Sequence, residues 1–326
     1  MESRAFGGTS LRVSEVGLGC ARLGGIFQQD VRPFLDLVAA AVDSGITFFD
    51  TADMYSQGES ETLLGRALRG KRDRVVIATK AGYRLPARRR LLSRLKPLVR
   101  PLIRALGLRR EQFPASVRGE PTQEFSPAYL RRAVEGSLRR LRTDRIDLFQ
   151  LHSPPADVIE RAEWLEALEA LRREGKILHW GISCDTADAA LAALRQPGAA
   201  SIQIPLSLIE RRVAEAALPA ARERGVAVIA REVLANGLLA KDAASVDLAR
   251  YCSSPEEQAL RSQQIAHHRR TAESSGVTLL QLALQYARTL PGVSVMLIGA
   301  STSEQLRGSL RAMESAPPAA ALAFGA

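Results

Sequence analysis

The sequence predicts an α/β protein, a (β/α)8 TIM barrel that carries an N-terminal β-hairpin and a long basic insertion after the third strand. Two observations support this prediction. From residue 46 onward, apolar runs of strand length alternate with amphipathic helical stretches, which is typical of βαβ units in a parallel sheet. With one earlier run there are eight such strands, and this number favours a closed barrel over an open, doubly wound sheet.

Each predicted strand is a short run rich in apolar and β-branched residues. In chain order the strands are predicted at Val16–Cys20, Thr47–Asp50, Val75–Thr79, Ile146–Gln150, Leu178–Ser183, Ser201–Ile204, Val226–Ala230 and Val293–Ile298. Helices are predicted at Arg32–Ser44, Glu59–Arg69, Pro127–Leu141, Val158–Glu174, Ala187–Arg195, Val213–Arg224, Pro255–Ser274 and Leu279–Thr289, with Thr278 as the N-cap of the last.

Three segments lie outside this repeat. The first, Arg4–Val13, carries two consecutive glycines between short β-like runs, and we expect a hairpin that covers the bottom of the barrel. The irregular stretch Leu238–Ser254 follows the seventh strand and is expected to be a loop on the catalytic face. Residues 316–326 are rich in Ala and Pro, and we expect a mobile surface tail. The chain, 1–326, is predicted to be one domain.

The composition is that of a soluble globular protein, with 46% hydrophobic and 25% charged residues. Three widely spaced cysteines, Cys20, Cys184 and Cys252, form no Cys-x-x-Cys pair, so we expect a reducing compartment and no structural metal. The N-terminus lacks the apolar core of a signal peptide, and no stretch reaches about 18 uninterrupted apolar residues. These features predict a cytoplasmic protein without stable membrane insertion.

The net charge of +10 belongs to one segment of the chain. Within residues 84–110 there are ten cations and no acid, and removing these ten from the 45 Lys and Arg leaves 35, the number of Asp and Glu. The remainder is therefore neutral by count. The ten cations are Arg84, Arg88, Arg89, Arg90, Arg94, Lys96, Arg100, Arg104, Arg109 and Arg110.

This basic insertion, residues 84–125, is much longer than a usual connection between a strand and its helix. Its leucines between Leu91 and Leu106 keep a helical spacing, which predicts a basic amphipathic helix that Pro97 and Pro101 interrupt. Because the insertion begins on the catalytic face, it could form a lid whose cations meet an anionic substrate. It could equally pack on the barrel with its arginines in water, or dock on a membrane surface or an acidic partner. No aromatic stacking platform supports nucleic-acid binding.

Four polar residues follow three of the predicted strands. Asp50 and Tyr55 follow the second strand, Lys80 the third and His152 the fourth. Loops after the strands of a TIM barrel build its active site, so these side chains should converge. An ammonium beside a phenol lowers its pKa, and a carboxylate beside the ammonium holds it charged. The four residues therefore predict a Tyr general acid tuned by a Lys–Asp pair, with a His that orients a carbonyl or shares the proton.

Taken singly, these residues have ordinary structural explanations. A carboxylate at a strand end is commonly a helix N-cap or part of a loop salt bridge, and Lys80 alone could be a solvated charge. The combination after three different strands in one barrel pattern is what favours the catalytic interpretation.

The motifs around these residues also resemble a known family. Phe48-Phe49-Asp50-Thr51-Ala52-Asp53-Met54-Tyr55 and Asp147-Leu148-Phe149-Gln150-Leu151-His152-Ser153-Pro154 are similar to stretches of the aldo-keto reductases, especially bacterial members related to sugar dehydrogenases and general-purpose reductases. The resemblance implies hydride transfer between a nicotinamide and an aldehyde, ketone or sugar, with Tyr55 as general acid or base, Lys80 and Asp50 tuning it, and His152 orienting the substrate oxygen. A cofactor-binding regulatory subunit that serves a partner protein is the alternative, which the intact tetrad disfavours.

The resemblance also implies which residues hold the nicotinamide. Ser183 matches a carboxamide-binding Ser, whereas Cys184 stands where the family usually has Asn, and a thiol is a weak hydrogen-bond partner. Gln203 matches a Gln that binds the same carboxamide. Arg231 replaces the aromatic residue that stacks on the ring, and its positive charge leans toward the reduced, neutral cofactor.

The segment before the last helix resembles the family's phosphate-binding motif, and a helix N-terminus is a ready anion site. Gly299, Ser301 and Thr302 belong to this segment, while Gln305 and Ser309 are expected to face the adenosine end. Because Ser301 stands where many relatives have Arg, the case for a 2′-phosphate is weaker. NADP(H) is still favoured, with NAD(H) as the alternative, and the expected partner is a small carbonyl or sugar substrate.

Overall fold

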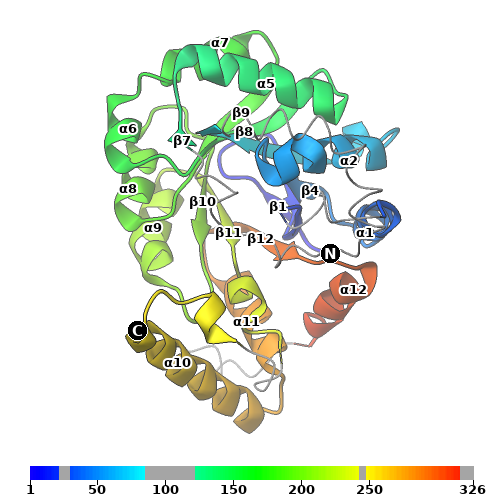
Figure 1. The fold of residues 1–326 in the computed structure, drawn as a ribbon, viewed down its shortest axis with the longest axis vertical. Coiled ribbons are helices and arrows are strands. Elements are labelled where there is room, and N and C mark those ends of the chain that lie inside the picture. The colour runs from blue at the N-terminus through cyan, green and yellow to red at the C-terminus, as the bar shows by residue number, and fades with distance from the viewer. Residues whose placement is uncertain (22–29, 85–121, 242–246, 316–326) are drawn as a thin grey trace, which may run out of the picture.

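A computed structural model describes residues 1–21, 30–84, 122–241 and 247–315, and in it eight parallel strands close into a barrel (Figure 1). Neighbouring barrel strands follow the order β10, β11, β12, β3, β4, β5, β8 and β9, and β9 pairs with β10 to close the ring. The (β/α)8 prediction is therefore confirmed. The barrel strands are β3 (Val16–Gly19), β4 (Phe48–Asp50), β5 (Val76–Ala81), β8 (Ile146–His152), β9 (Ile177–Ser183), β10 (Ser201–Pro205), β11 (Ala227–Arg231) and β12 (Val293–Gly299).

Helices surround the barrel as an outer ring (Figure 1). They are α1 (Arg32–Asp43), α2 (Glu59–Ala67), α5 (Pro127–Leu141), α6 (Ala156–Arg161), α7 (Leu165–Arg173), α8 (Ala187–Arg195), α9 (Arg212–Glu223), α10 (Pro255–Ser274), α11 (Leu279–Thr289) and α12 (Ser303–Ala312). Short 3-10 turns are η1 (Tyr55–Gly58), η2 (Arg72–Arg74), η5 (Ala235–Gly237) and η7 (Leu248–Arg250). The predicted N-cap of α11 is confirmed, because the Thr278 hydroxyl accepts from the Gln281 N–H and the Gln281 side chain accepts from the Thr278 N–H.

One predicted helix is wrong. The stretch Val158–Glu174 is divided into α6 and α7, because Ala162 adopts a left-handed conformation with φ of 52° and ends α6. The break allows Trp164 to turn inward, where its indole N–H donates to the Val158 carbonyl and its ring packs edge-on against Trp180. No Gly or Pro marks this break, so the sequence pattern did not indicate it.

The predicted N-terminal hairpin is confirmed, with β1 (Ser3–Ala5) antiparallel to β2 (Arg12–Ser14). Phe6 and Val13 of this hairpin are fully buried and pack with apolar side chains inside the barrel. The Phe6 and Phe48 rings lie 5.8 Å apart. The hairpin therefore closes the end of the barrel where the strands begin.

Side chains of the barrel strands alternate between two environments. Phe48, Ala78 and Ile229 belong to the apolar cluster inside the barrel, while their strand neighbours pack outward against the helices. The interior is so full that a Cβ on Gly17 would lie 2.8 Å from a methyl of Leu297. A packed lower half leaves only the end where the strands finish for a polar site.

The base of the basic insertion is a short two-stranded ribbon. Tyr83–Arg84 (β6) pairs antiparallel with Thr122–Gln123 (β7), and Arg84 forms an ion pair of 2.9 Å with Glu124. The amphipathic helix predicted after it falls on residues 85–121, which lie outside the described residues, as does the tail at 316–326.

Candidate active site

Because side chains alternate along each strand, polar side chains lie at the mouth of the barrel, which is the end where the strands finish. Asp50 lies two residues beyond Phe48, Lys80 two beyond Ala78 and Arg231 two beyond Ile229, so each continues an inward-facing row. Lys80 and His152 lie within β5 and β8, because both strands extend further than predicted through the pairs Lys80↔Gln150 and His152↔Ser183.

Asp50 and Lys80 form a buried ion pair at the centre of this mouth. The Lys80 ammonium donates to both carboxylate oxygens of Asp50, at 2.7 and 2.6 Å, and to the Thr51 carbonyl at 3.0 Å. The side chains of Lys80 and Asp50 are only 1% and 5% exposed, so solvent screens their attraction very little. These three contacts hold the ammonium in place.

Amide side chains complete the surroundings of Asp50. The Gln203 amide donates to Oδ1 at 2.9 Å, and the Gln150 amide reaches the same oxygen at 3.5 Å. The Ser183 hydroxyl lies 3.5 Å from Oε1 of the Gln203 side chain. The structure thus brings the predicted nicotinamide residues Ser183 and Gln203 next to the predicted tetrad. Gln150 is an addition that the sequence did not single out, although it faces inward two residues before His152.

Tyr55 reaches this group from the turn after β4. Ser56 and Gln57 both have positive φ, 50° and 63°, which is uncommon for residues other than glycine and bends the chain sharply after Tyr55. The Lys80 ammonium lies 5.2 Å from the centre of the Tyr55 ring, and the Tyr55 and His152 rings meet edge-on at 5.8 Å. The four residues of the predicted tetrad therefore lie together.

The expected lowering of the Tyr55 pKa is not what this geometry gives. Burial raises the pKa of Tyr55 above its usual value, and the Lys80 ammonium opposes this only in part. The pKa of Lys80 is also raised, because the attraction of Asp50 and Tyr55 outweighs the effect of burial. Tyr55 therefore keeps its proton beside the charged Lys80, which is the protonation state that a general acid requires, although the raised pKa makes the phenol a weaker proton donor.

His152 is held in its neutral form. Burial lowers its pKa well below the usual range, and the cations of Lys80 and Arg231 lower it further. Nδ1 of His152 is buried and has no hydrogen-bond partner within the described part of the chain. A neutral imidazole in this position can donate a hydrogen bond that orients a substrate oxygen. It does not bring a second acidic proton to that oxygen.

This neutrality gives a prediction for His152. Because its folded pKa is depressed, its imidazole signals should not titrate as pH falls through about 6.5, the usual pKa of histidine. A nuclear magnetic resonance titration, with His152→Gln to assign the signal, measures this directly. An imidazole signal of His152 with a midpoint near 6.5 contradicts the buried, cation-facing environment.

Cys184 does not fit its predicted role. Its side chain is fully buried in the cluster between barrel and helices, and its thiol donates to the Ile182 carbonyl at 3.7 Å. The reason is alternation, since Ser183 faces inward and the next residue along the strand must face outward. The thiol therefore replaces the usual amide without pointing into the mouth.

Arg231 lies at the mouth but is already ion-paired. Its guanidinium contacts the carboxylates of Asp185 and Glu232, and it also donates to the Cys184 carbonyl at 3.4 Å. Asp185 in turn accepts from the Ser153 hydroxyl at 2.9 Å. These contacts tie the loops after β8, β9 and β11 together. Two carboxylates offset the Arg231 charge. The prediction that this charge favours binding of the reduced cofactor therefore loses its basis.

The predicted phosphate segment lies at the N-terminus of α12. Thr302 caps the helix by accepting from the Gln305 N–H at 3.2 Å, and the Gln305 side chain accepts from the Ser301 N–H at 2.9 Å. Gly299, Ser301, Thr302 and Gln305 are exposed, whereas Ser309 is 8% exposed on the buried face of the helix. An approach of Ser309 to adenosine is therefore not supported, because its side chain faces the protein interior.

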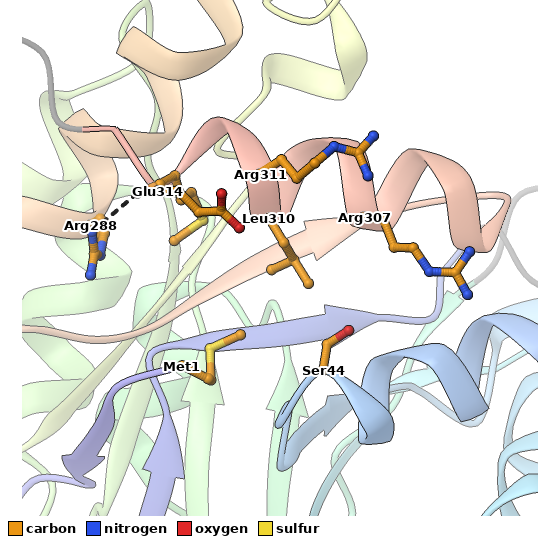
Figure 2. A pocket seen from close by; sticks show the side chains of 8 residues that line it. Met1, Ser44, Arg288, Arg307, Leu310, Arg311 and Glu314 are labelled. Carbon is orange, nitrogen blue, oxygen red and sulfur yellow. Dashed lines mark hydrogen bonds between the residues drawn. The ribbon is translucent and has the colours of Figure 1, made fainter.

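Two hollows in the described part of the chain lie away from the tetrad. One, of about 450 Å³, is beside α12 and the ends of α1 and α11, on the side where the strands begin (Figure 2). Its Arg288 already contacts Glu15 at 2.9 Å, and Glu314 contributes a carboxylate. The other, of about 340 Å³, lies between the end of α2 with the segment that follows it, Ile77 of β5 and the end of α5. Neither is lined by a tetrad residue.

None of the helices in the described ranges combines the length and the apolar content that crossing a membrane requires.

Comparisons with known proteins agree with this geometry. Residues 15–320 match the model of the Aldo/keto reductase family. The chain is 32% identical over 322 residues to the uncharacterized oxidoreductase YqkF of Bacillus subtilis, covering 96% of this chain and 91% of the relative. It is 32% identical to pyridoxal 4-dehydrogenase of Microbacterium luteolum, covering 97% and 94%. The solved holo form of aldo-keto reductase AKR11C1 from Bacillus halodurans superposes with a TM-score of 0.78 at 30% identity, covering 99% and 94%.

Proposed function

This chain belongs to the aldo/keto reductase family and is an oxidoreductase, and on that premise we propose that it transfers a hydride between a nicotinamide cofactor and the carbonyl or alcohol carbon of a small molecule. The observation that carries the proposal is the buried Asp50–Lys80 pair at the barrel mouth, with Tyr55 and His152 beside it.

The residues of this chain divide the proton chemistry between them. Tyr55 donates its phenolic proton to the carbonyl oxygen during reduction, and the resulting phenolate lies next to the Lys80 ammonium. Asp50 holds that ammonium in place, and neutral His152 orients the substrate oxygen. When bound, the nicotinamide supplies the hydride for reduction or accepts it in the reverse direction. Because burial raises the pKa of Tyr55, the phenol carries its proton near neutral pH, which is the form that donates a proton during reduction.

The cofactor residues fit a nicotinamide only in part. Gln150 Oε1 is buried without a partner in the described ranges, close to Asp50, so the mouth still offers a polar contact. In this proposal Ser183 and Gln203, which lie 3.5 Å apart, bind the carboxamide, and Ser301 and Thr302 at the start of α12 bind a phosphate. The Ser301 N–H must first be released by Gln305. We propose NADP(H) as the cofactor, with NAD(H) as the alternative.

The substrate we propose is a small aldehyde, ketone or sugar. The relative named pyridoxal 4-dehydrogenase makes pyridoxal and its alcohol natural members of a test panel. An anionic substrate stays a prediction that rests on the basic residues of 85–121, outside the described part of the chain. Replacing Arg88, Arg89 and Arg90 by Ser should raise KM for anionic compounds only.

The test is a fluorescence titration with NADPH and NADH, followed by cofactor oxidation with a panel of aldehydes, keto-sugars and pyridoxal. Turnover of at least one carbonyl with the tighter-binding cofactor supports the proposal. Tight cofactor binding without turnover of any carbonyl or alcohol favours instead the cofactor-binding regulatory subunit.

A further inference from the structure

The turn that carries Tyr55 contains a second carboxylate, Asp53, whose contacts differ from those of Asp50. The Asp53 N–H donates to the Lys80 carbonyl at 2.9 Å, which anchors the turn to β5. Its Oδ2 accepts from the Tyr129 hydroxyl at 3.4 Å. Its Oδ1 is buried and has no hydrogen-bond partner among residues of the described ranges. Asp53 is therefore a half-buried acid whose carboxylate accepts one long side-chain hydrogen bond, from Tyr129.

Tyr129 connects this turn to Tyr83, which packs against His152. Its hydroxyl lies 3.3 Å from the carbonyl oxygen of Tyr83, in β6 at the base of the insertion. The ring of Tyr83 packs edge-on against His152, with centroids 4.9 Å apart. Tyr129 lies in the first turn of α5. Its hydroxyl thus links Asp53, in the turn that carries Tyr55, to Tyr83, which packs on His152.

A hydroxyl has one proton, so the protonation state of Asp53 decides where that proton points. When Asp53 is ionised, the Tyr129 proton is drawn to the carboxylate and the Tyr83 carbonyl loses its donor. When Asp53 carries a proton, it can donate that proton to the Tyr129 oxygen, and Tyr129 donates its own to Tyr83. Both contacts are then satisfied as a chain of two hydrogen bonds.

Burial is the largest cause of a raised pKa at Asp53, and the charged groups around it add smaller effects of both signs. Burial raises the pKa of Asp53 to about 7, the carboxylate of Glu61 in α2 adds to the rise, and Arg140 in α5 opposes it. Arg140 is itself engaged with Glu61 at 2.5 Å, which limits its effect on Asp53. Tyr129 and the Met54 N–H favour the ionised form through hydrogen bonds.

We propose that Asp53 and Tyr129 form a positioning pair, in which the protonation of Asp53 controls how firmly Tyr83 is held against His152 and thereby sets the affinity for the carbonyl substrate. The proposal rests on the proposed function, because the position of Tyr83 affects binding only if the substrate oxygen lies beside His152. Asp53 itself acts through Tyr129 and Tyr83 and does not react.

The kinetic test is the pH dependence of KM for a substrate from the panel. In the wild type, KM should rise about fivefold, the effect of one net hydrogen bond, with a midpoint near the ionisation of Asp53, while kcat does not follow this step. Asp53→Asn keeps a donor toward Tyr129 and should hold KM at the low-pH value throughout. Tyr129→Phe removes the bridge and should hold KM at the high-pH value. A step that persists in either variant overturns the proposal.

A second measurement needs no turnover and so separates this proposal from the proposed function. Because the folded pKa of Asp53 is raised, folding favours its protonated form, and the stability this gives is lost as pH rises through the folded pKa. The Tm of Asp53→Asn minus that of the wild type should therefore increase from about pH 4 to about pH 7 and stay constant above. A difference in Tm that does not change with pH overturns the proposal, whether or not any carbonyl is reduced.

Discussion

Replacing Tyr55 by Phe should lower kcat about a thousandfold, within the range that a positioned general acid contributes. The change removes one oxygen atom and leaves the ring that meets His152 in place, so cofactor binding should be unchanged. Steady-state kinetics with the best panel substrate, together with a cofactor titration, measures both quantities.

The matched control is Tyr251→Phe, which removes the same atom from an exposed residue far from the tetrad in sequence. It should leave kcat and KM at wild-type values. If Tyr55→Phe retains wild-type turnover, Tyr55 is not the proton donor, and the role of the Asp50–Lys80 pair has to be reconsidered with it.

Replacing Lys80 by Met should lower the free energy of unfolding by about 3–5 kcal/mol, because it leaves a buried carboxylate without its counter-charge. The Asp50 side chain is 5% exposed, and among the described residues it keeps the amide donors of Gln203 and Gln150. The double variant Asp50→Asn/Lys80→Met should recover a large part of this loss, since no charge is then buried. Urea unfolding of the two single variants and the double variant gives the coupling energy. Activity should be lost in all three variants.

Arg161→Met is the control for this loss. Arg161 pairs with Asp157 across one helical turn, but both side chains are more than half exposed, so the free energy of unfolding should change by less than about 0.5 kcal/mol. A Lys80→Met protein as stable as the wild type shows that the Asp50–Lys80 pair is not isolated from solvent.

The features that could be predicted from the sequence are those set by periodicity along the chain. Apolar runs such as Val293–Ile298 located all eight barrel strands to within two residues at each end. This is possible because strands of a parallel sheet are buried on both faces and therefore consist of continuous apolar residues. The convergence of Asp50, Lys80 and His152 followed from the rule that strand ends meet at one face of a barrel. The resemblance to a family added Ser183 and Gln203, which lie beside Asp50 and which we propose as cofactor residues.

The features that could not be predicted depend on contacts between distant residues. Asp53 and Tyr129 are 76 residues apart, and neither belongs to a pattern that links them. The net pKa of Tyr55 depends on how deeply the ring is buried, which spacing does not reveal. Cys184 was assigned by motif, although strand alternation from Ser183 already places it on the outer face of the barrel.

The most direct test of hydride transfer follows an isotope. The wild type is given a panel carbonyl and the reduced cofactor in which both hydrogens at C4 of the nicotinamide are deuterium, and the alcohol product is analysed by mass spectrometry. We expect deuterium on the former carbonyl carbon of the product, and we expect no labelled alcohol above background with Tyr55→Phe over the same period. Alcohol formed without the label contradicts direct hydride transfer, and labelled alcohol formed at the wild-type rate by Tyr55→Phe contradicts the role of Tyr55 as proton donor.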